Sequence, residues 1–344
     1  MGELKIENIK EIYMRLGDKV SKEIFQNRLL YSLTGDVSYI EQVVCSIKKG
    51  KELYERMKVE QESWGIFGAG DVGRHMVAVY KDIKFVCFID NKRAGTTYEG
   101  LPVVSLEEFK RRYPSSGVII STKLYYKEIL KQLLEEGYKE DRILNLGMEY
   151  EKLNHKQYFD LPILEEKREE KEIFVDCGSY DGATSIDFIN WCKKLDRGGY
   201  IYAWEPDPSN QEKCKKVFEK NNMEYQLIPK GLWSEKKELK LKMDGTGSVI
   251  SEDGEILVEV DSIDNLIKEE ITFIKMDIEG SEYQALLGAR NIISTYKPKL
   301  AICIYHKPED IWELPGLIQE IHPGYTFFLR HYSFADNETV LYAL

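Results

Sequence analysis

Long hydrophobic runs are missing from this sequence. No segment of the 344 residues is apolar for long enough to span a bilayer, and residues 1–19 carry charges where a signal peptide would have an apolar stretch. Basic residues are also in the minority, because Lys and Arg number 48 against 59 Asp and Glu, for a net charge of -11. Since binding of a phosphate backbone depends on clustered Lys and Arg, we expect no nucleic-acid partner. We expect a cytoplasmic protein without a membrane span.

Paired cysteines are absent too. Six cysteines are scattered along the chain, and no two have the C-x-x-C spacing of metal or redox sites, so we expect reduced cysteines in the core. Hydrophobic residues make up 43% and aromatic residues 12% of the sequence, which is ample material for buried cores. The length exceeds that of one ordinary compact core, so more than one domain is expected.

The first half of the chain changes its pattern twice. Residues 1–62 place apolar side chains at helical spacing, so a small helical element is expected. In residues 63–148 the apolar runs GIFGAG, KFVCFID, GVIIST and RILNLG alternate with amphipathic stretches, which is typical of a parallel sheet with helices. Residues 149–171 become polar and contain EEKREEKE, which favours a linker, with a solvated helix face as the alternative.

A second strand and helix alternation fills residues 172–344. The runs EIFVDCG, GYIYAWEP, EYQLIPKG, ITFIKMD and KLAICIYH predict five buried strands. An inserted hairpin is predicted around a turn at residues 252–254, and a closing hairpin at the sheet edge around residues 336–337. The sequence therefore predicts an α/β protein with two doubly wound Rossmann-like domains and a small N-terminal helical element. The sheet of the second domain should be mixed.

A glycine turn follows the first strand of the second domain. In FVDCGSYDGATS, Asp176 ends the strand, and Gly178 and Gly182 let the backbone pass close to a ligand. Thr184 opens the following helix, whose N-terminal amides would face that ligand. Glu205 ends the next strand, 29 residues beyond Asp176, and can accept hydrogen bonds from both hydroxyls of a ribose. An acid after a glycine turn that lacks G-x-G-x-x-G favours S-adenosylmethionine over a dinucleotide.

Four sequence blocks occur in order between residues 174 and 328. They are VDCGSYDGATS, WEPDPSN, VDSIDNLIKEEITFIKMDIEGSEYQALLGAR and KPKLAICIYHKPEDIWELP. The third is the most specific, because K-x-D-x-E-G-x-E followed by A-L-x-G-A is a long ordered string. With these blocks the segment resembles the FkbM family of S-adenosylmethionine-dependent methyltransferases. One departure is that Ser179-Tyr180 replaces the family's usual Ala-Asn pair after the first glycine.

The resemblance implies a class I methyltransferase fold and, as the reaction, methylation of an oxygen. It also implies that Asp176, Gly178 and Gly182 hold the methionine part of the cofactor, and Glu205 its ribose. The complete set assigned to the cofactor site is Asp176, Gly178, Ser179, Gly182, Thr184, Glu205, Pro206 and Asp277.

Acidic residues and a histidine follow the fourth and fifth strands of this domain. Asp277 ends the fourth strand, Glu279 follows in the loop, and Glu282 lies in the first helical turn, where a negative charge is favourable by itself. His306 ends the fifth strand and can serve as a base near neutral pH beside a carboxylate. Because methyl transfer to a hydroxyl needs alignment and removal of a proton, we predict Asp277, Glu279 and His306 as catalytic residues. Their spacing fixes no coordination geometry, so no metal site is expected.

Another glycine turn lies in the N-terminal half. WGIFGAGDVGRHM places Gly68, Gly70 and Gly73 between a strand and a helix, and Asp90 ends the next strand 22 residues beyond Gly68. This is the dinucleotide fingerprint, but the unit is short and shows no catalytic partner. IFGAGDVGR, FIDNK and GLPVVSLEEF are similar to small nucleotide-binding domains that precede sugar-modifying acyltransferases and some methyltransferases in surface-polysaccharide pathways. The unit is expected to hold the nucleotide of a nucleotide-linked sugar, to dock the protein, or to have no ligand.

The leading functional prediction is an S-adenosylmethionine-dependent O-methyltransferase that modifies carbohydrates. Its substrate would be a small molecule or glycan, with the methyl group going to a hydroxyl of a sugar, a nucleotide-sugar or a related compound. One alternative is a non-catalytic module that binds the cofactor or a nucleotide-sugar. Asp176, Glu205, Asp277 and Glu279 occur together, which disfavours this alternative. The other alternative is an NAD-dependent sugar oxidoreductase centred on the N-terminal glycine turn.

Overall fold

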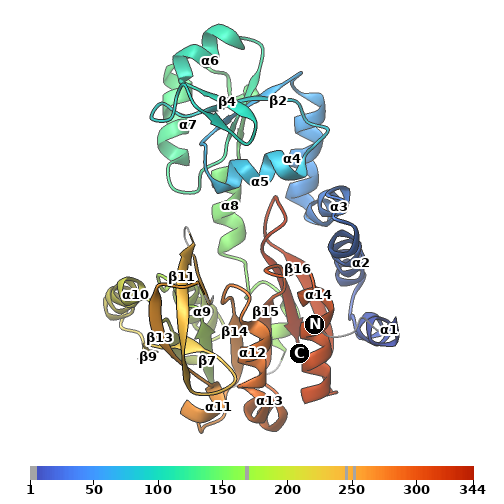
Figure 1. Ribbon diagram of the computed structural model, residues 1–344, viewed down its shortest axis with the longest axis vertical. Helices are drawn as coiled ribbons and strands as arrows, with labels where there is room; N and C mark the ends of the chain where they lie inside the picture. Colours follow the sequence, from blue (N-terminus) through green and yellow to red (C-terminus); the bar gives the residue numbers. More distant parts are fainter. Residues whose placement is uncertain (1–5, 167–169, 245–246, 251–252) are drawn as a thin grey trace. The chain divides into compact units, whose positions relative to one another are not determined.

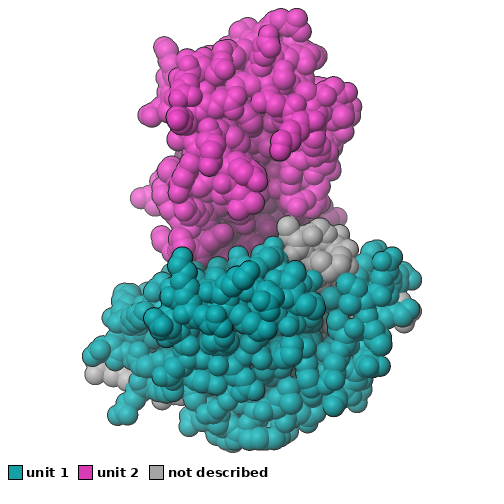
Figure 2. Space-filling view, turned by 90° about the vertical axis from the view of Figure 1, so that its left-hand side faces the viewer, with its two compact units in different colours: residues 1–22, 158–330, 339–344 teal, residues 23–157, 331–338 magenta. Residues whose placement is uncertain are grey.

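The chain forms two compact units. The computed structural model describes residues 6–166, 170–244, 247–250 and 253–344. Unit 1 comprises residues 1–22, 158–330 and 339–344, and unit 2 comprises residues 23–157 and 331–338 (Figure 2). No helix among the described residues is long and apolar enough to cross a membrane.

The main sheet of unit 1 has seven strands in the order β16-β17-β15-β14-β7-β8-β9 (Figure 1). Pairing is parallel from β15 through β14, β7 and β8 to β9, and β17 runs antiparallel to β15, so the predicted mixed sheet is confirmed. The chain crosses from β9 back to β14, which makes the gap between β7 and β14 the switch point where ligands bind in such sheets. The strands are β7 (Lys171–Cys177), β8 (Gly198–Trp204), β9 (Tyr225–Ile228), β14 (Phe273–Met276), β15 (Lys299–Cys303), β16 (Phe327–His331) and β17 (Thr339–Ala343).

Helices connect these strands, and their starts follow from local chemistry. The longest, α10, begins after Asp207, whose carboxylate accepts hydrogen bonds from the amides of Ser209 and Asn210, with Pro208 at the first helical position. The helices of unit 1 are α1 (Ile6–Met14), α9 (Ala183–Lys194), α10 (Pro208–Lys220), α11 (Ile263–Leu266), α12 (Glu282–Leu287), α13 (Arg290–Tyr296) and α14 (Asp310–Ile321), with the short 3-10 helix η2 (Pro162–Glu165).

A small second sheet lies between β9 and β14 in sequence. It has the order β10-β13-β11-β12. The inserted hairpin predicted around residues 252–254 corresponds to the antiparallel pair β11 and β13, but β12 adds a further antiparallel strand that the sequence did not suggest. Residue 252 of the predicted turn lies outside the described residues. The strands are β10 (Gly231–Leu232), β11 (Lys237–Asp244), β12 (Gly247–Ile250) and β13 (Ile256–Asp261).

Unit 2 is built on a sheet of order β3-β4-β2-β1-β5-β6, with a switch point between β1 and β5. Among the described residues its neighbouring strands pair in parallel, except β3 with β4. Helices connect β1 to β2, β4 to β5 and β5 to β6, as the alternating pattern predicted. The strands are β1 (Trp64–Phe67), β2 (Phe85–Ile89), β3 (Thr97–Tyr98), β4 (Leu101–Val104), β5 (Gly117–Ile120) and β6 (Ile143–Asn145). The helices are α2 (Lys19–Thr34, which begins in unit 1), α3 (Ser38–Cys45), α4 (Lys48–Val59), α5 (Asp71–Val79), α6 (Leu106–Arg112), α7 (Tyr126–Glu135), η1 (Glu140–Arg142) and α8 (Leu146–Asn154).

The connection between β16 and β17 belongs to the core of unit 2. Phe334 and Ala335 are each 1% exposed and join the hydrophobic cluster that contains Tyr80 and Tyr150. The Tyr80 hydroxyl donates to the Phe334 carbonyl at 2.8 Å, and the Tyr150 hydroxyl accepts from the Phe334 amide at 3.2 Å. A segment expected to be a simple edge hairpin is thus part of a core formed mainly by residues far away in the sequence.

The segment 149–171 is more structured than a linker. It holds the end of α8 and the helix η2, and Tyr158, Phe159, Leu161 and Leu164 are buried. Residues 167–169 of the charged run that favoured a linker lie outside the described residues. The segment is ordered because the apolar side chains of YFDLPIL, just before that run, are buried in a hydrophobic core.

Candidate functional site

The glycine turn after β7 lies at the switch point of the unit 1 sheet. Gly178 has φ +80°, and a Cβ atom there would lie 2.1 Å from the carbonyl oxygen of Asp277. Gly182 has φ +81° and also approaches Phe218 closely. Any other residue at Gly178 would clash with backbone and adopt an unfavourable conformation. The turn therefore brings the backbone after β7 into direct contact with the end of β14.

Asp176 supports this turn from inside the protein. Its carboxylate is fully buried, accepts a hydrogen bond from the Ser185 hydroxyl at 2.7 Å and pairs with the Lys275 ammonium at 3.1 Å. Lys275 also donates to the carbonyls of Cys177 and Gly178, at 3.2 and 2.8 Å. Lys275 was missed by sequence reasoning, although a lysine inside the apolar strand ITFIKMD is a signal that it has a buried partner.

Glu205 joins the turn to the end of β8. It is 5% exposed, and its two carboxylate oxygens accept the amides of Tyr180 and Asp207, each at 2.9 Å. Burial raises the pKa of Glu205 above its ordinary value. Each oxygen keeps a lone pair, so the carboxylate can accept further hydrogen bonds from a ligand. Pro206 follows directly after this acid.

The two hydroxyl residues assigned to the cofactor site differ in their surroundings. Ser179 is buried and its hydroxyl donates to the carbonyl of Asp176 at 3.0 Å. Thr184 is half-buried in the first turn of α9. The structure therefore places all residues assigned to the cofactor around the ends of β7, β8 and β14.

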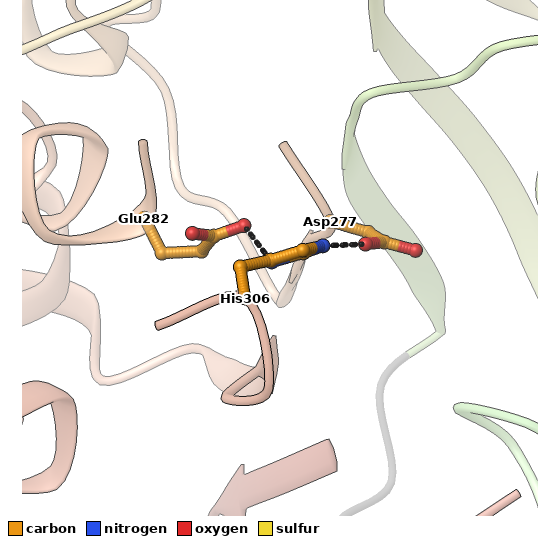
Figure 3. A group of neighbouring side chains, drawn as sticks. All are labelled: Asp277, Glu282 and His306. Carbon is orange, nitrogen blue, oxygen red and sulfur yellow. Dashed lines mark ion pairs between the residues drawn. The ribbon is translucent and has the colours of Figure 1, made fainter. Parts of the chain in front are cut away.

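The predicted catalytic residues come together beyond β14 and β15. In Figure 3 the imidazole of His306 lies between the carboxylates of Asp277 and Glu282. His306 Nε2 is 3.4 Å from Oδ1 of Asp277 and 3.6 Å from Oε2 of Glu279. Its Nδ1 is 3.1 Å from Oε1 of Glu282. Glu282, interpreted from sequence as a charge favourable for the helix, is instead fully buried against the histidine.

Charge dominates the behaviour of this cluster. Burial alone would lower the pKa of His306, but the surrounding carboxylates, first of all that of Glu282, raise it to about 9. Burial raises the pKa of Asp277, but the positive charges of Lys275 and His306 outweigh this effect and hold it below its ordinary value. The cluster thus attracts positive charge strongly, which suits a site next to a cationic sulfonium.

Two tyrosines complete the surroundings of Asp277. The Tyr158 hydroxyl donates to Oδ2 at 3.0 Å, and the Tyr305 hydroxyl donates to Oδ1 at 3.3 Å. Sequence reasoning missed both. Tyr305 stands next to His306 in IYHK and could have been included, but Tyr158 comes from the segment expected to be a linker.

The predicted N-terminal site occupies the corresponding edge of the unit 2 sheet. Gly68 has φ +112°, Gly70 precedes α5 and has open space around it, and a Cβ atom at Gly73 would lie 2.7 Å from the Phe88 ring. Asp90 stabilises its own turn, because Oδ1 accepts the amides of residues 92 and 93 at 2.9 and 3.2 Å. The glycines thus form a tight turn, whereas part of the Asp90 carboxylate is already engaged.

Unit 1 combines a mixed sheet ending in an antiparallel strand, a glycine turn at the switch point and an acid after the next strand, which is the arrangement of class I methyltransferases. Residues 176–334 match the family model described as the methyltransferase FkbM domain. This segment of the chain is therefore a methyltransferase domain of the FkbM family, as its sequence blocks suggested. Residues 61–144, within unit 2, match a model described as C2185-like, N-terminal.

A solved structure with a TM-score above 0.5 supports the fold. The methyltransferase FkbM from Methylobacillus flagellatus KT is 21% identical, with 85% of this chain and 93% of that chain covered and a TM-score of 0.53. Fibrillarin from Aeropyrum pernix, solved with natively bound S-adenosyl-L-methionine, is 14% identical over 57% of this chain and 76% of its own, with a TM-score of 0.35. No curated protein matches the sequence significantly.

Proposed function

We propose that this protein is an S-adenosylmethionine-dependent O-methyltransferase that acts on a hydroxyl of a sugar, a nucleotide-sugar or a related small molecule. The contact between the glycine turn and the end of β14 is the observation that carries the proposal. Because a Cβ at Gly178 would lie 2.1 Å from the Asp277 carbonyl, a cofactor held by the turn lies beside the cluster of Asp277, Glu279 and His306. Methyl donor and proton acceptor are thereby neighbours, as in-line transfer requires.

The cofactor would be held mainly by backbone and by one carboxylate. Gly178, Ser179 and Gly182 would place the turn against the methionine part, while Thr184 presents the start of α9 to it. Glu205 and Pro206 would hold the ribose, with Glu205 accepting from its hydroxyls. Asp176 would act through Lys275, because its own carboxylate is fully buried.

The reaction joins the acceptor oxygen to the methyl carbon and breaks the bond between that carbon and the sulfonium sulfur. The products are a methyl ether and S-adenosylhomocysteine, and the proton of the hydroxyl passes to a group of the enzyme. Glu279 is the best-placed proton acceptor for a substrate arriving from solvent, because its side chain is 43% exposed while that of His306 is 9% exposed. Asp277 would orient the acceptor.

Cofactor binding gives the first test. Calorimetric titration with S-adenosylhomocysteine should show binding to the full chain, and Glu205→Ala should weaken it by about 10- to 100-fold, because charged hydrogen bonds of about 1.5–3 kcal/mol are lost. Glu212→Ala, which removes an exposed glutamate of α10, is the matched control and should bind normally. Absence of binding, or equal affinity in Glu205→Ala, would reject the cofactor assignment.

The acceptor can be found by incubation with the cofactor labelled in its methyl group and a panel of nucleotide sugars and free sugars. Asp277→Asn and Glu279→Gln should lose transfer by at least about 100-fold while keeping their affinity for S-adenosylhomocysteine. Normal turnover in both variants would remove these residues from the mechanism. Binding of the cofactor without transfer to any acceptor would favour the non-catalytic alternative.

Unit 2 supports a second binding function. We propose that its glycine turn holds the nucleotide of a nucleotide-linked sugar, since the first amides of α5 face open space at Gly70. Uridine or guanosine diphosphate should bind in titration calorimetry, and Gly70→Asp should weaken this binding at least about 10-fold by placing a negative charge at the phosphate. Glu205→Ala is the control that should leave it unchanged. Binding of NAD in place of these nucleotides would favour the oxidoreductase alternative.

A further inference from the structure

We propose that Asp277, Glu282 and His306 bind a divalent transition-metal ion. Each offers one ligand atom, and these atoms all lie within 4.8 Å of one another. Figure 3 shows the two carboxylates on either side of the imidazole ring. From the sequence we expected no metal, because the spacing fixes no geometry. The structure supplies that geometry by bringing α12 and the end of β15 to the end of β14.

Buried atoms of the cluster lack hydrogen-bond partners among the described residues. Both ring nitrogens of His306 lack a hydrogen-bond partner, although the side chain is only 9% exposed. So is Oε2 of the fully buried Glu282, whose Oε1 accepts the amide of Ile278 at 2.8 Å. Leaving buried polar groups unsatisfied destabilises a folded protein. A bound cation would satisfy Oε2 or Oε1 of Glu282 and one of the two ring nitrogens together.

The separations are those of ligands around one ion, slightly expanded. Ligands about 2.1 Å from a metal lie about 3.0–3.4 Å apart when they are adjacent and about 4.2 Å apart when they are opposite. Oδ1 of Asp277 lies 3.4 Å from Nε2 of His306, and the three ligand atoms, one from each residue, all lie within 4.8 Å of one another. Neither ring nitrogen makes a hydrogen bond in this arrangement, so either one can serve as the single imidazole ligand. If these ligand atoms moved toward one another by a few tenths of an ångström, they could all bind the same ion.

The local charge favours a bound cation. Three carboxylates, those of Asp277, Glu279 and Glu282, surround the imidazole. The buried ammonium of Lys275 is paired with Asp176. Carboxylate and imidazole together are the ligands of Zn²⁺, Mn²⁺ and Fe²⁺ rather than of Ca²⁺. Glu279, at the exposed side of the cluster, is placed to join the ion or to face the substrate.

Such an ion would act as a Lewis acid and lower the pKa of an acceptor hydroxyl that binds to it. This catalytic role rests on the proposed function. Binding of the ion is independent of the proposed function, because it depends only on Asp277, Glu282 and His306.

Titration of the chelator-treated full chain with Mn²⁺ at pH 7.5, followed by electron paramagnetic resonance, tests the site directly. We expect one ion per chain, and at least about 10-fold weaker binding in His306→Gln and in Glu282→Gln. His155→Ala, which changes an exposed histidine, should bind Mn²⁺ as the unaltered protein does. Zn²⁺ should compete with Mn²⁺ for the site.

The proposal is overturned if Mn²⁺ does not bind, or if both variants bind it with unchanged affinity. Circular dichroism shows whether the variants fold, and Asp277→Asn serves as the third variant if Glu282→Gln does not. Titration with S-adenosylhomocysteine on the same samples separates the two proposals. Mn²⁺ binding without cofactor binding rejects the methyltransferase mechanism alone, and the reverse result rejects the metal site alone.

Discussion

Lys275→Met should destabilise the protein by about 3–5 kcal/mol, because it leaves the Asp176 carboxylate buried without its cationic partner. Lys275 is 2% exposed, and its ammonium also donates to the carbonyls of Cys177 and Gly178. Loss of these bonds should loosen the glycine turn as well. Urea unfolding measures the first effect, and calorimetry with S-adenosylhomocysteine should show weaker binding from the second.

The double variant Asp176→Asn/Lys275→Met is the control for the charge. An asparagine needs no cation and can still accept the Ser185 hydroxyl, so at least half of the lost stability should return. If the single and double variants are equally unstable, the loss comes from packing around the lysine stem. If Lys275→Met unfolds at the same urea concentration as the unaltered protein, the buried pair has no structural role.

Asp310→Asn should stabilise the protein at pH 8 by up to about 4 kcal/mol. Asp310 is 4% exposed, and burial, followed by the charge of Glu282, raises its pKa to about 7. Because this pKa is higher in the folded than in the unfolded state, the aspartate favours folding below about pH 4. That contribution is lost as the pH rises to about 7. Asparagine keeps an oxygen for the Lys307 amide, which Asp310 accepts at 2.9 Å.

The measurement is urea unfolding from pH 4 to pH 8 in the presence of a chelator, so that bound metal does not contribute. The stability gap between Asp310→Asn and the unaltered protein should be small at pH 4 and widen as the pH rises. Asp196→Asn, at an exposed position, should show no such trend. A gap that is constant across this range would show that Asp310 titrates as it does in the unfolded chain.

Local patterns in the sequence were enough to predict the alternating strands and helices, the two glycine turns and the acid at Glu205. They also placed Asp277 and His306 at the same sheet edge, because Asp277 directly follows β14 and His306 comes three residues after β15, its parallel neighbour. These features depend on periodicity and on residues close in sequence, which a single sequence displays.

Contacts between distant segments were not predictable in the same way. Lys275 was overlooked because its partner Asp176 lies on another strand, and Tyr158 because nothing in its surroundings indicates that its hydroxyl reaches Asp277. Glu282 has a sufficient local explanation at the start of a helix, so its contact with His306 could not be inferred. In each case the identity of the partner follows from a pairing that exists only after the sheet has formed.

Residues 331–338 belong to unit 2, although they are separated in sequence from the rest of that unit. A fragment that ends at residue 157 contains most of unit 2 but lacks Phe334 and Ala335, which are buried in its core. Such a fragment would expose the apolar surfaces of Tyr80 and Tyr150 and should aggregate when expressed alone. In genetic terms, a single crossover cannot exchange this unit between related genes, because two separated coding segments have to be inherited together.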